Sequence, residues 1–275
     1  MTTALKSGAT GMQAMQPNRW RSREEAELST ASLKALLANE IPAIRIRDFA
    51  TPAECVSFAK AVSEAELSYY SVARKIGYIG LAQYEYRWNR PKSDYFRDVL
   101  PVERKRDMVQ AKSFNALHRF VDILGRYNAA GVDIASEALG HYFAGVIRNA
   151  SEGVDLHVDY APINSPAYSI AAIDAQLGWN FYAQGLVSGG ETTVYNVPWN
   201  PRFEPGEIPQ SYNLPRDAIE GGESFTFRPS VGDVVIFNTR NPHEIAGGVS
   251  GPGHDRISIG SFVGRMPSGQ LVLWS

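Results

Sequence analysis

Two histidines and one aspartate have the residue types and spacing of a transition-metal site. His157 and Asp159 are separated by one residue, and His243 follows Asp159 after 84 positions. If residues 156–159 form a strand, the side chains of His157 and Asp159 point to the same face and can ligate one ion. Two imidazoles and one carboxylate leave three coordination positions open, the arrangement that non-haem Fe(II) oxygenases use. Zn(II) or Mn(II) could occupy the same ligand set.

The third ligand has to come from a distant segment. His243 follows the run Gly232-Asp233-Val234-Val235-Ile236-Phe237, which is typical of a turn that leads into an apolar strand. We therefore expect His243 at a strand end that faces the mouth of a barrel. The remaining histidines, His118, His141 and His254, lie in a helical or glycine-rich context and are predicted to have surface or capping roles.

An arginine and a serine follow the second histidine. In Arg256-Ile257-Ser258, strand alternation places Arg256 and Ser258 on the same face. A guanidinium offers a rigid fork that matches a carboxylate, and a hydroxyl can add a further hydrogen bond. This pair suits the distal carboxylate of 2-oxoglutarate, whose 2-oxo acid end would chelate the metal. The alternative is that Arg256 pairs with Asp255 or Asp233 at the surface.

The composition is that of an ordinary globular protein. The 275 residues are 44% hydrophobic and 20% charged, with a formal net charge of −2, so they give no electrostatic signature of nucleic-acid binding. No apolar run reaches the roughly 20 residues of a membrane span, and the N-terminus lacks the apolar segment of a signal peptide. A single cysteine, Cys55, fits the reducing cytoplasm. We expect a flexible N-terminus over residues 1–20 and one domain over residues 21–275.

The two halves of the chain differ in pattern. The first half predicts helices and the second half predicts short strands separated by turns, which together indicate an α+β fold. Thr51-Pro52-Ala53-Glu54 has the residues of a helix start with a capping box. The expected elements are a helix over 22–39, a strand over 41–49, a helix over 51–65, and strand fragments with a long aromatic loop over 67–98. Two helices follow within 102–139, broken near 125–131, and strands begin at 142.

These residues resemble the Fe(II)/2-oxoglutarate-dependent dioxygenase superfamily. The resemblance covers about residues 140–265 and implies a double-stranded β-helix (jelly-roll) core flanked by N-terminal helices. It also implies that His157, Asp159 and His243 are the iron ligands, that Arg256 binds 2-oxoglutarate with help from Ser258, and that O2 is the oxidant. The stretch from Gly189 to Asn200 is similar to a branch that contains free-standing aliphatic halogenases and hydroxylases of free or N-succinylated amino acids, the N-succinyl-leucine hydroxylase type among them.

The residue at position 159 separates the two activities of that branch. Its halogenases replace the carboxylate ligand with glycine or alanine, so that chloride can bind iron. This chain keeps Asp159. The resemblance therefore implies hydroxylation of an unactivated C–H bond in a small molecule, with 2-oxoglutarate converted to succinate and CO2.

The substrate residues are predicted from charge and aromaticity. Arg74 and Arg87 lie in the aromatic loop, and Arg148 precedes the iron motif, so each could anchor an acidic substrate. Trp179 could form an apolar wall, and the 67–98 loop could act as a lid.

Two other interpretations stay open on the sequence alone. One is a cupin-like isomerase or hydrolase that uses another metal without 2-oxoglutarate, and the other is a metal-binding barrel without enzymatic activity. The predicted partner is a small molecule, with neither nucleic acid nor a membrane, and the helical N-terminal half could serve a homodimer.

Overall fold

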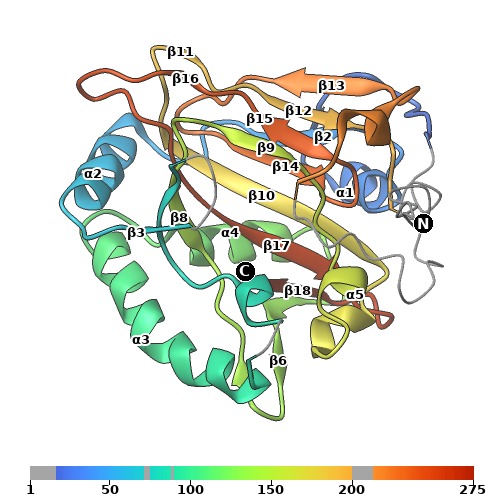
Figure 1. Ribbon diagram of the computed structural model, residues 1–275, viewed down its shortest axis with the longest axis horizontal. Coiled ribbons are helices and arrows are strands. Elements are labelled where there is room, and N and C mark those ends of the chain that lie inside the picture. Colours follow the sequence, from blue (N-terminus) through green and yellow to red (C-terminus); the bar gives the residue numbers. More distant parts are fainter. Residues whose placement is uncertain (1–16, 71–74, 88–89, 200–212) are drawn as a thin grey trace, which may run out of the picture.

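Five α-helices surround two facing β-sheets in the computed structural model, which describes residues 17–70, 75–87, 90–199 and 213–275 (Figure 1). Those helices are α1 (Thr30–Leu37), α2 (Pro52–Ser63), α3 (Lys92–Gln110), α4 (Ala116–Gly125) and α5 (Ala161–Asn164). No helix in the described part of the chain is long and apolar enough to cross a membrane.

The larger sheet has ten strands and is mostly antiparallel. Its main path runs through β1 (Ala26–Glu27), β2 (Ala43–Ile46), β14 (Val234–Asn238), β10 (Ala175–Gln184), β17 (Ile257–Arg265), β8 (Val146–Asn149), β4 (Gly77–Ile79) and β3 (Ser68–Tyr69). At one end of β17, β18 (Leu271–Trp274) and β5 (Val132–Ile134) extend the sheet. The longest strands, β10 and β17, pair along almost their whole length.

The smaller sheet has four strands and carries the two histidines. Its order is β13 (Ser224–Phe227), β12 (Thr192–Tyr195), β15 (His243–Ile245) and β9 (Val154–His157), all antiparallel. Two short antiparallel pairs complete the set, β11 (Ser188–Gly189) with β16 (Gly248–Val249) and the hairpin of β6 (Ser136–Glu137) with β7 (Gly140–His141).

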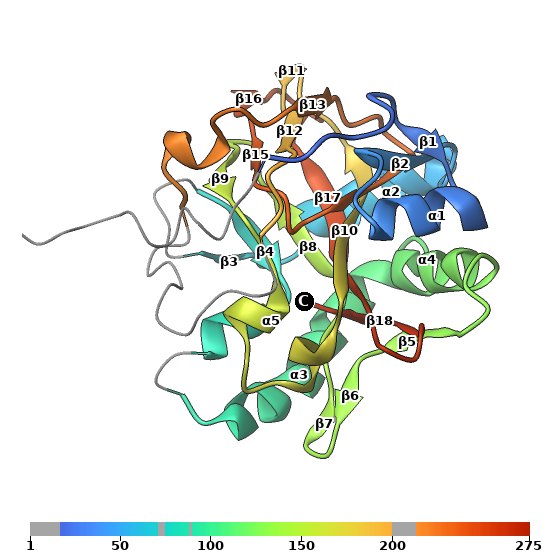
Figure 2. The same cartoon turned by 90° about the vertical axis from the view of Figure 1, so that its right-hand side faces the viewer.

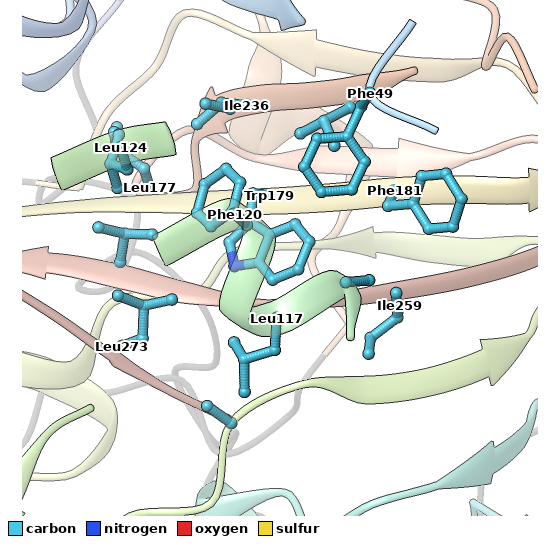
Figure 3. Close-up of a cluster of buried hydrophobic side chains, with 14 of the residues drawn as sticks. Phe49, Leu117, Phe120, Leu124, Leu177, Trp179, Phe181, Ile236, Ile259 and Leu273 are labelled. Atoms are coloured by element: carbon cyan, nitrogen blue, oxygen red, sulfur yellow. The ribbon is translucent and has the colours of Figure 1, made fainter. Parts of the chain in front are cut away.

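The two faces of the larger sheet have different partners. Figure 2 shows α1, α2 and α4 on one side of β10, and the smaller sheet lies toward the other side. Alternation along β10 explains this division, because Leu177, Trp179 and Phe181 all point into the core beneath the helices. The ring of Trp179 stacks on Phe120 of α4 with centroids 4.0 Å apart (Figure 3). The residues between these three in β10 face the smaller sheet.

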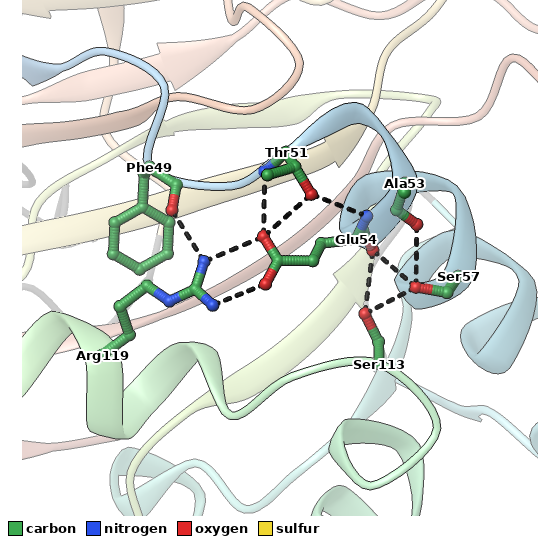
Figure 4. A network of polar contacts seen from close by, with 7 residues as sticks. All are labelled: Phe49, Thr51, Ala53, Glu54, Ser57, Ser113 and Arg119. Atoms are coloured by element: carbon green, nitrogen blue, oxygen red, sulfur yellow. Dashed lines mark hydrogen bonds and ion pairs between the residues drawn. The ribbon is translucent and has the colours of Figure 1, made fainter.

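The helix start at Thr51 is confirmed. The Thr51 side chain accepts from the backbone N–H of Glu54, and the Glu54 carboxylate accepts from the backbone N–H of Thr51, which is a capping box. Glu54 also receives two hydrogen bonds from Arg119 of α4, so the cap joins two helices (Figure 4). This contact fixes α2 and α4 against each other on the sheet.

Two expected segments differ from the structure. Over 67–98, the predicted strand fragments are present as β3 and β4, but part of the predicted loop is a short 3-10 helix and the beginning of α3. The helices expected within 102–139 break at residues 111–115 and not near 125–131, and residues 132–141 form strands instead. The sheet supplies the reason: β5 adds alongside β18, so backbone pairing at an open edge outweighs a weak helical pattern.

Candidate active site

The three predicted ligands lie together between the sheets. His157 ends β9, His243 begins β15, and the two residues are direct partners in the sheet. The Nε2 atoms of His157 and His243 lie 3.6 and 3.7 Å from Asp159 Oδ2. Ligand atoms that each bind one ion at about 2 Å are roughly 3 to 4 Å apart, so the three groups fit a single metal ion. All three are buried.

Backbone carbonyls orient both imidazoles. The Nδ1 atom of His157 lies 2.7 Å from the carbonyl oxygen of Asp155, and that of His243 lies 2.9 Å from the carbonyl oxygen of Asn241. A carbonyl can only accept, so each Nδ1 carries the proton and donates it. Each Nε2 then carries a lone pair that can bind a metal. A metal-bound histidine usually donates its other ring N–H to a carbonyl or a carboxylate in this way.

Burial keeps both imidazoles neutral. It lowers the pKa of His157 to about 4. For His243, burial is the larger cause and the neighbouring His157 the next, and its pKa falls to about 3. Neutral imidazoles are the form that ligates metals, so the site is ready for a cation at neutral pH.

Arg256 fits an anionic co-substrate. Its side chain is buried and lies over the ring of Tyr182, with the guanidinium carbon 5.2 Å from the ring centroid. Among the described residues no carboxylate lies within ion-pair distance of Arg256, and its Nε has no hydrogen-bond partner there. Burial lowers its pKa. Removing a guanidinium from water without a counter-ion is costly, so the site suits an anion brought by a ligand.

The surface-pair alternative for Arg256 is not supported. Asp233 pairs instead with Arg45, at 3.2 Å. Arg256 and Ser258 both line the pocket between the sheets, whereas Ile257 belongs to the core on the helical side. The Arg256 guanidinium and the Ser258 hydroxyl therefore lie on one face, as the alternation predicted. They line the same cavity as His157, Asp159 and His243.

The same pocket contains a second arginine. Arg148 of β8 is the direct cross-strand partner of Ser258 in β17, so their side chains share a face. Its positive charge contributes to the lowered pKa of Arg256. Tyr70, Tyr84 and Asn180 also line this cavity. With Asn213, which also lines it, the pocket offers two cationic groups, an aromatic wall and two side-chain amides.

The predicted substrate residues have different positions. Arg148 lines the pocket, whereas Arg87 packs beside it, with Nη1 donating to the carbonyl of Tyr84 at 3.2 Å. Arg74 lies outside the described residues. Trp179 is also among the residues that line the pocket, but its ring stacks on Phe120 in the core. Its role as a substrate wall stays a prediction.

Asn180 was missed by sequence reasoning. It follows Trp179 in β10 and is a polar residue within the apolar run Leu177 to Ala183, at a position that alternation assigns to the face opposite the helices. That interruption of an otherwise buried strand is the signal that could have identified it.

Two histidines and an aspartate that can hold one metal ion, beside a buried arginine, have the arrangement of an oxygenase that uses iron and 2-oxoglutarate. Comparison of sequences reaches the same class. Residues 22–275 match the sequence model of the carrier-protein-independent halogenase WelO5 family, and the chain belongs to that family within the Fe(II)/2-oxoglutarate oxygenase superfamily.

Two proteins of known name are similar to this chain in sequence. The chain is 33% identical over 219 residues to leucinostatins biosynthesis cluster protein S of Purpureocillium lilacinum, covering 73% of this chain and 86% of that protein. It is 33% identical over 161 residues to L-gamma-glutamyl-L-propargylglycine hydroxylase of Streptantibioticus cattleyicolor, covering 56% of this chain and 57% of that protein.

A solved structure shares the fold. The N-substituted L-amino acid dioxygenase from Burkholderia ambifaria superimposes with a TM-score of 0.58 at 15% sequence identity, covering 90% of this chain and 91% of that chain. At this level of identity the likeness concerns the fold alone. It establishes a mixed α and β fold with a large sheet, as in 2-oxoglutarate oxygenases.

Proposed function

We propose that this protein is a hydroxylase that acts on an unactivated C–H bond of a free or N-acylated amino acid, such as an N-succinyl amino acid. The observation that carries the proposal is Asp159. Although the family takes its name from a halogenase, this chain keeps a carboxylate beside both histidines, where the halogenases leave room for chloride. Three protein ligands and a bidentate 2-oxo acid would leave one position for O2.

The residues of the chain would have separate tasks. His157, Asp159 and His243 would hold the metal, and Arg256 with Ser258 would hold the distal carboxylate of 2-oxoglutarate. When bound, iron and 2-oxoglutarate supply the oxidising chemistry: O2 is consumed, 2-oxoglutarate leaves as succinate and CO2, and one oxygen atom enters the C–H bond. The protein's part is to orient the substrate and exclude water, so position selects the carbon that reacts.

The substrate class is argued from the pocket. Arg148 gives a carboxylate-bearing substrate a cationic anchor, separate from the one assigned to 2-oxoglutarate. Tyr70 and Tyr84 offer an apolar surface for an aliphatic side chain, and Asn180 can pair with an amide. The name of one relative, an L-gamma-glutamyl-L-propargylglycine hydroxylase, supports a substrate that carries both a carboxylate and an amide.

We also propose that the two facing sheets form a double-stranded β-helix core and that residues 21–275 act as one domain. The support is the antiparallel pairing of both sheets around a shared pocket. A homodimer and a cytoplasmic location stay predictions from sequence. Light scattering would test the first.

The test is substrate-stimulated succinate formation. Protein loaded with Fe(II) without oxygen is given 2-oxoglutarate and then O2, with a panel of free, N-succinylated and γ-glutamylated amino acids and with added chloride. We expect one panel member to stimulate succinate release and to gain 16 mass units, the mass of one oxygen atom.

The variants and products separate the alternatives. Arg256→Ala should abolish coupled turnover at ordinary 2-oxoglutarate concentrations. A product that gains chlorine in place of hydrogen would replace the hydroxylase by a halogenase. Absence of turnover, together with absence of a visible Fe(II)–2-oxoglutarate absorption band, would leave the cupin-like alternative.

A further inference from the structure

Three buried asparagines connect the end of α1 to the turn that precedes His243. The side-chain Nδ2 of Asn241 donates to Asn39 Oδ1 at 2.7 Å, and Asn39 Nδ2 donates to Asn196 Oδ1 at 2.9 Å. None of the three is more than 5% exposed, although they come from distant parts of the chain. We call Asn39, Asn196 and Asn241 the asparagine chain.

The backbone of Asn39 sets the direction of its side chain. Asn39 follows Ala38, the C-cap of α1, and has a φ of 59°, in the left-handed region that asparagine tolerates better than most residues. Its backbone N–H donates to the carbonyl of Leu36 at 3.0 Å. The middle member of the asparagine chain is therefore fixed by a helix end and does not belong to a free loop.

A second contact ties the same turn to the same helix end. Asn238 Nδ2 donates to the carbonyl of Leu36 at 3.3 Å, and Asn238 Oδ1 accepts from the backbone N–H of Arg240 at 3.1 Å. The backbone N–H of Asn241 donates to the carbonyl of Asn238 at 3.2 Å. The turn over residues 238–241 is thus held to α1 through both Asn238 and Asn241.

The turn delivers the carbonyl that orients His243. Asn241 uses its side chain to reach Asn39 and its backbone oxygen to accept from His243 Nδ1 at 2.9 Å. His157 depends on the carbonyl of Asp155, within its own strand, so the two histidines are held by different means. A shift of α1 would therefore rotate the ring of His243 and leave His157 in place.

We propose that the asparagine chain positions His243, so that α1, on the far side of the larger sheet, helps set the geometry of the metal site. Asn39 and Asn241 are positioning residues, because neither touches the metal or the substrate. This inference rests on the proposed metal site. Outer partners of a metal-bound histidine typically change metal affinity by about 10–100-fold when they are removed.

The test uses variants that remove the side chain and keep the backbone. Asn39→Gly keeps the left-handed conformation, and Asn241→Ala keeps the carbonyl that faces His243. Asn196→Ala breaks only the outer bond of the chain. The matched control is Gln110→Ala, which removes another buried amide, one whose Oε1 accepts from the backbone N–H of Leu117 at 3.3 Å between α3 and α4.

The readouts are metal affinity and coordination, measured without oxygen. Fe(II) dissociation constants come from competition with a chelator, the visible spectrum of the Co(II)-loaded protein reports the coordination number, and thermal unfolding reports stability. We expect Asn39→Gly and Asn241→Ala each to weaken Fe(II) binding by about 10-fold or more and to alter the Co(II) spectrum. The double variant should bind Fe(II) no more weakly than the worse single variant, because both changes remove the same hydrogen bond between Asn241 and Asn39. Gln110→Ala should lower the melting temperature alone.

Each failure has a distinct reading. If the unchanged protein does not bind Fe(II), the proposed function is overturned. If it binds Fe(II), and Asn39→Gly and Asn241→Ala lower only the melting temperature as Gln110→Ala does, the positioning role is overturned. If Asn39→Gly does not fold, Asn196→Ala still tests whether the asparagine chain positions His243. We then expect a several-fold loss of Fe(II) affinity in Asn196→Ala, and an unchanged affinity would contradict the proposal.

Discussion

At the scale of a single residue, the proposed choice of hydroxylation over halogenation depends on Asp159. This residue is buried, its carboxylate lies beside both histidines, and its backbone N–H donates to the carbonyl of Thr239 at 3.0 Å. The main chain at this position is therefore held independently of the side chain. Replacing the side chain should open a coordination position without moving the strand that carries His157.

Asp159→Gly should lose most hydroxylation and gain weak chlorination when chloride is added. The reason is that the variant removes the only protein oxygen in the ligand set and leaves space for a small anion. Product masses with and without chloride provide the measurement, and Asp155→Asn, which keeps the histidine-orienting carbonyl, is the control. Undiminished hydroxylation by Asp159→Gly would remove Asp159 from the ligands.

Arg256→Lys tests the guanidinium fork. Lysine keeps the charge but cannot form two parallel hydrogen bonds, and charged hydrogen bonds contribute about 1.5–3 kcal/mol. We expect the KM for 2-oxoglutarate to rise by roughly 10–100-fold and Ser258→Ala to raise it only a few-fold. Steady-state kinetics at saturating substrate would measure both. Equal effects of the two variants would contradict the division of roles.

At the scale of elements, strand alternation along β10 separates packing from binding. Both residues border the pocket, but the ring of Trp179 stacks on Phe120 beneath α4, whereas Asn180 lies on the opposite face of the strand. Two neighbours in sequence should therefore respond to mutation in opposite ways.

Trp179→Phe should lower the free energy of unfolding by about 1–3 kcal/mol, since it removes part of a fully buried stacked ring. The substrate KM should stay within about twofold, because the ring does not face the pocket. Asn180→Ala should do the reverse and raise the substrate KM at little cost in stability. Urea unfolding and kinetics on both variants check this, and a large KM change in Trp179→Phe would restore it as a substrate residue.

The cap of α2 also joins elements, and its strength depends on pH. The hydrogen bonds from Arg119 are the largest reason why the pKa of Glu54 falls to about 2 from 4.5. A carboxyl whose pKa is lowered by folding stabilises the protein above the unfolded value, and that stabilisation is lost as pH falls from about 4.5 toward about 2.

Glu54→Gln should accordingly cost about 1–2 kcal/mol at pH 7. The cost should stay nearly constant down to about pH 5 and shrink at lower pH, because only then does the unfolded carboxyl of the unchanged protein take up its proton. Urea unfolding across this range is the measurement. Glu64→Gln, at the exposed end of the same helix, is the control and should change stability by less than about 0.5 kcal/mol. If the loss in the free energy of unfolding caused by Glu54→Gln did not change with pH, the contact between Glu54 and Arg119 would contribute packing alone.

The sequence predicted those elements whose signal lies within a few neighbouring residues. The capping box located α2, and alternation placed Arg256 and Ser258 on one face. The segment over 132–141 could not be predicted in this way, since β5 is defined by pairing with β18, which lies more than a hundred residues later. The asparagine chain escaped prediction for the same reason: Asn39, Asn196 and Asn241 are unremarkable apart, and only the fold brings them together.

At the scale of the whole molecule, the pocket joins the two sheets. The three metal-ligand candidates lie on β9 and β15 or just after them, in or beside the smaller sheet. Ser258 belongs to the larger sheet, and Arg256 directly precedes its strand β17. 2-Oxoglutarate chelated at one end and paired with Arg256 at the other would therefore bridge the sheets. Neither sheet alone contains a complete site, which explains why binding should stabilise the folded molecule as a unit.

Metal and 2-oxoglutarate should raise the melting temperature in two separable steps. A ligand at about 100 times its dissociation constant adds about 2.7 kcal/mol, which corresponds to several degrees in a protein of this size. We expect Mn(II) alone to give one increment and 2-oxoglutarate to add a second only when metal is present. Arg256→Ala should keep the first increment and lose the second, whereas His157→Ala should lose both, because the 2-oxo acid end then has no ion to chelate. Calorimetry on the three proteins decides this, and a 2-oxoglutarate increment that survives in His157→Ala would mean that the co-substrate binds elsewhere and does not bridge the sheets.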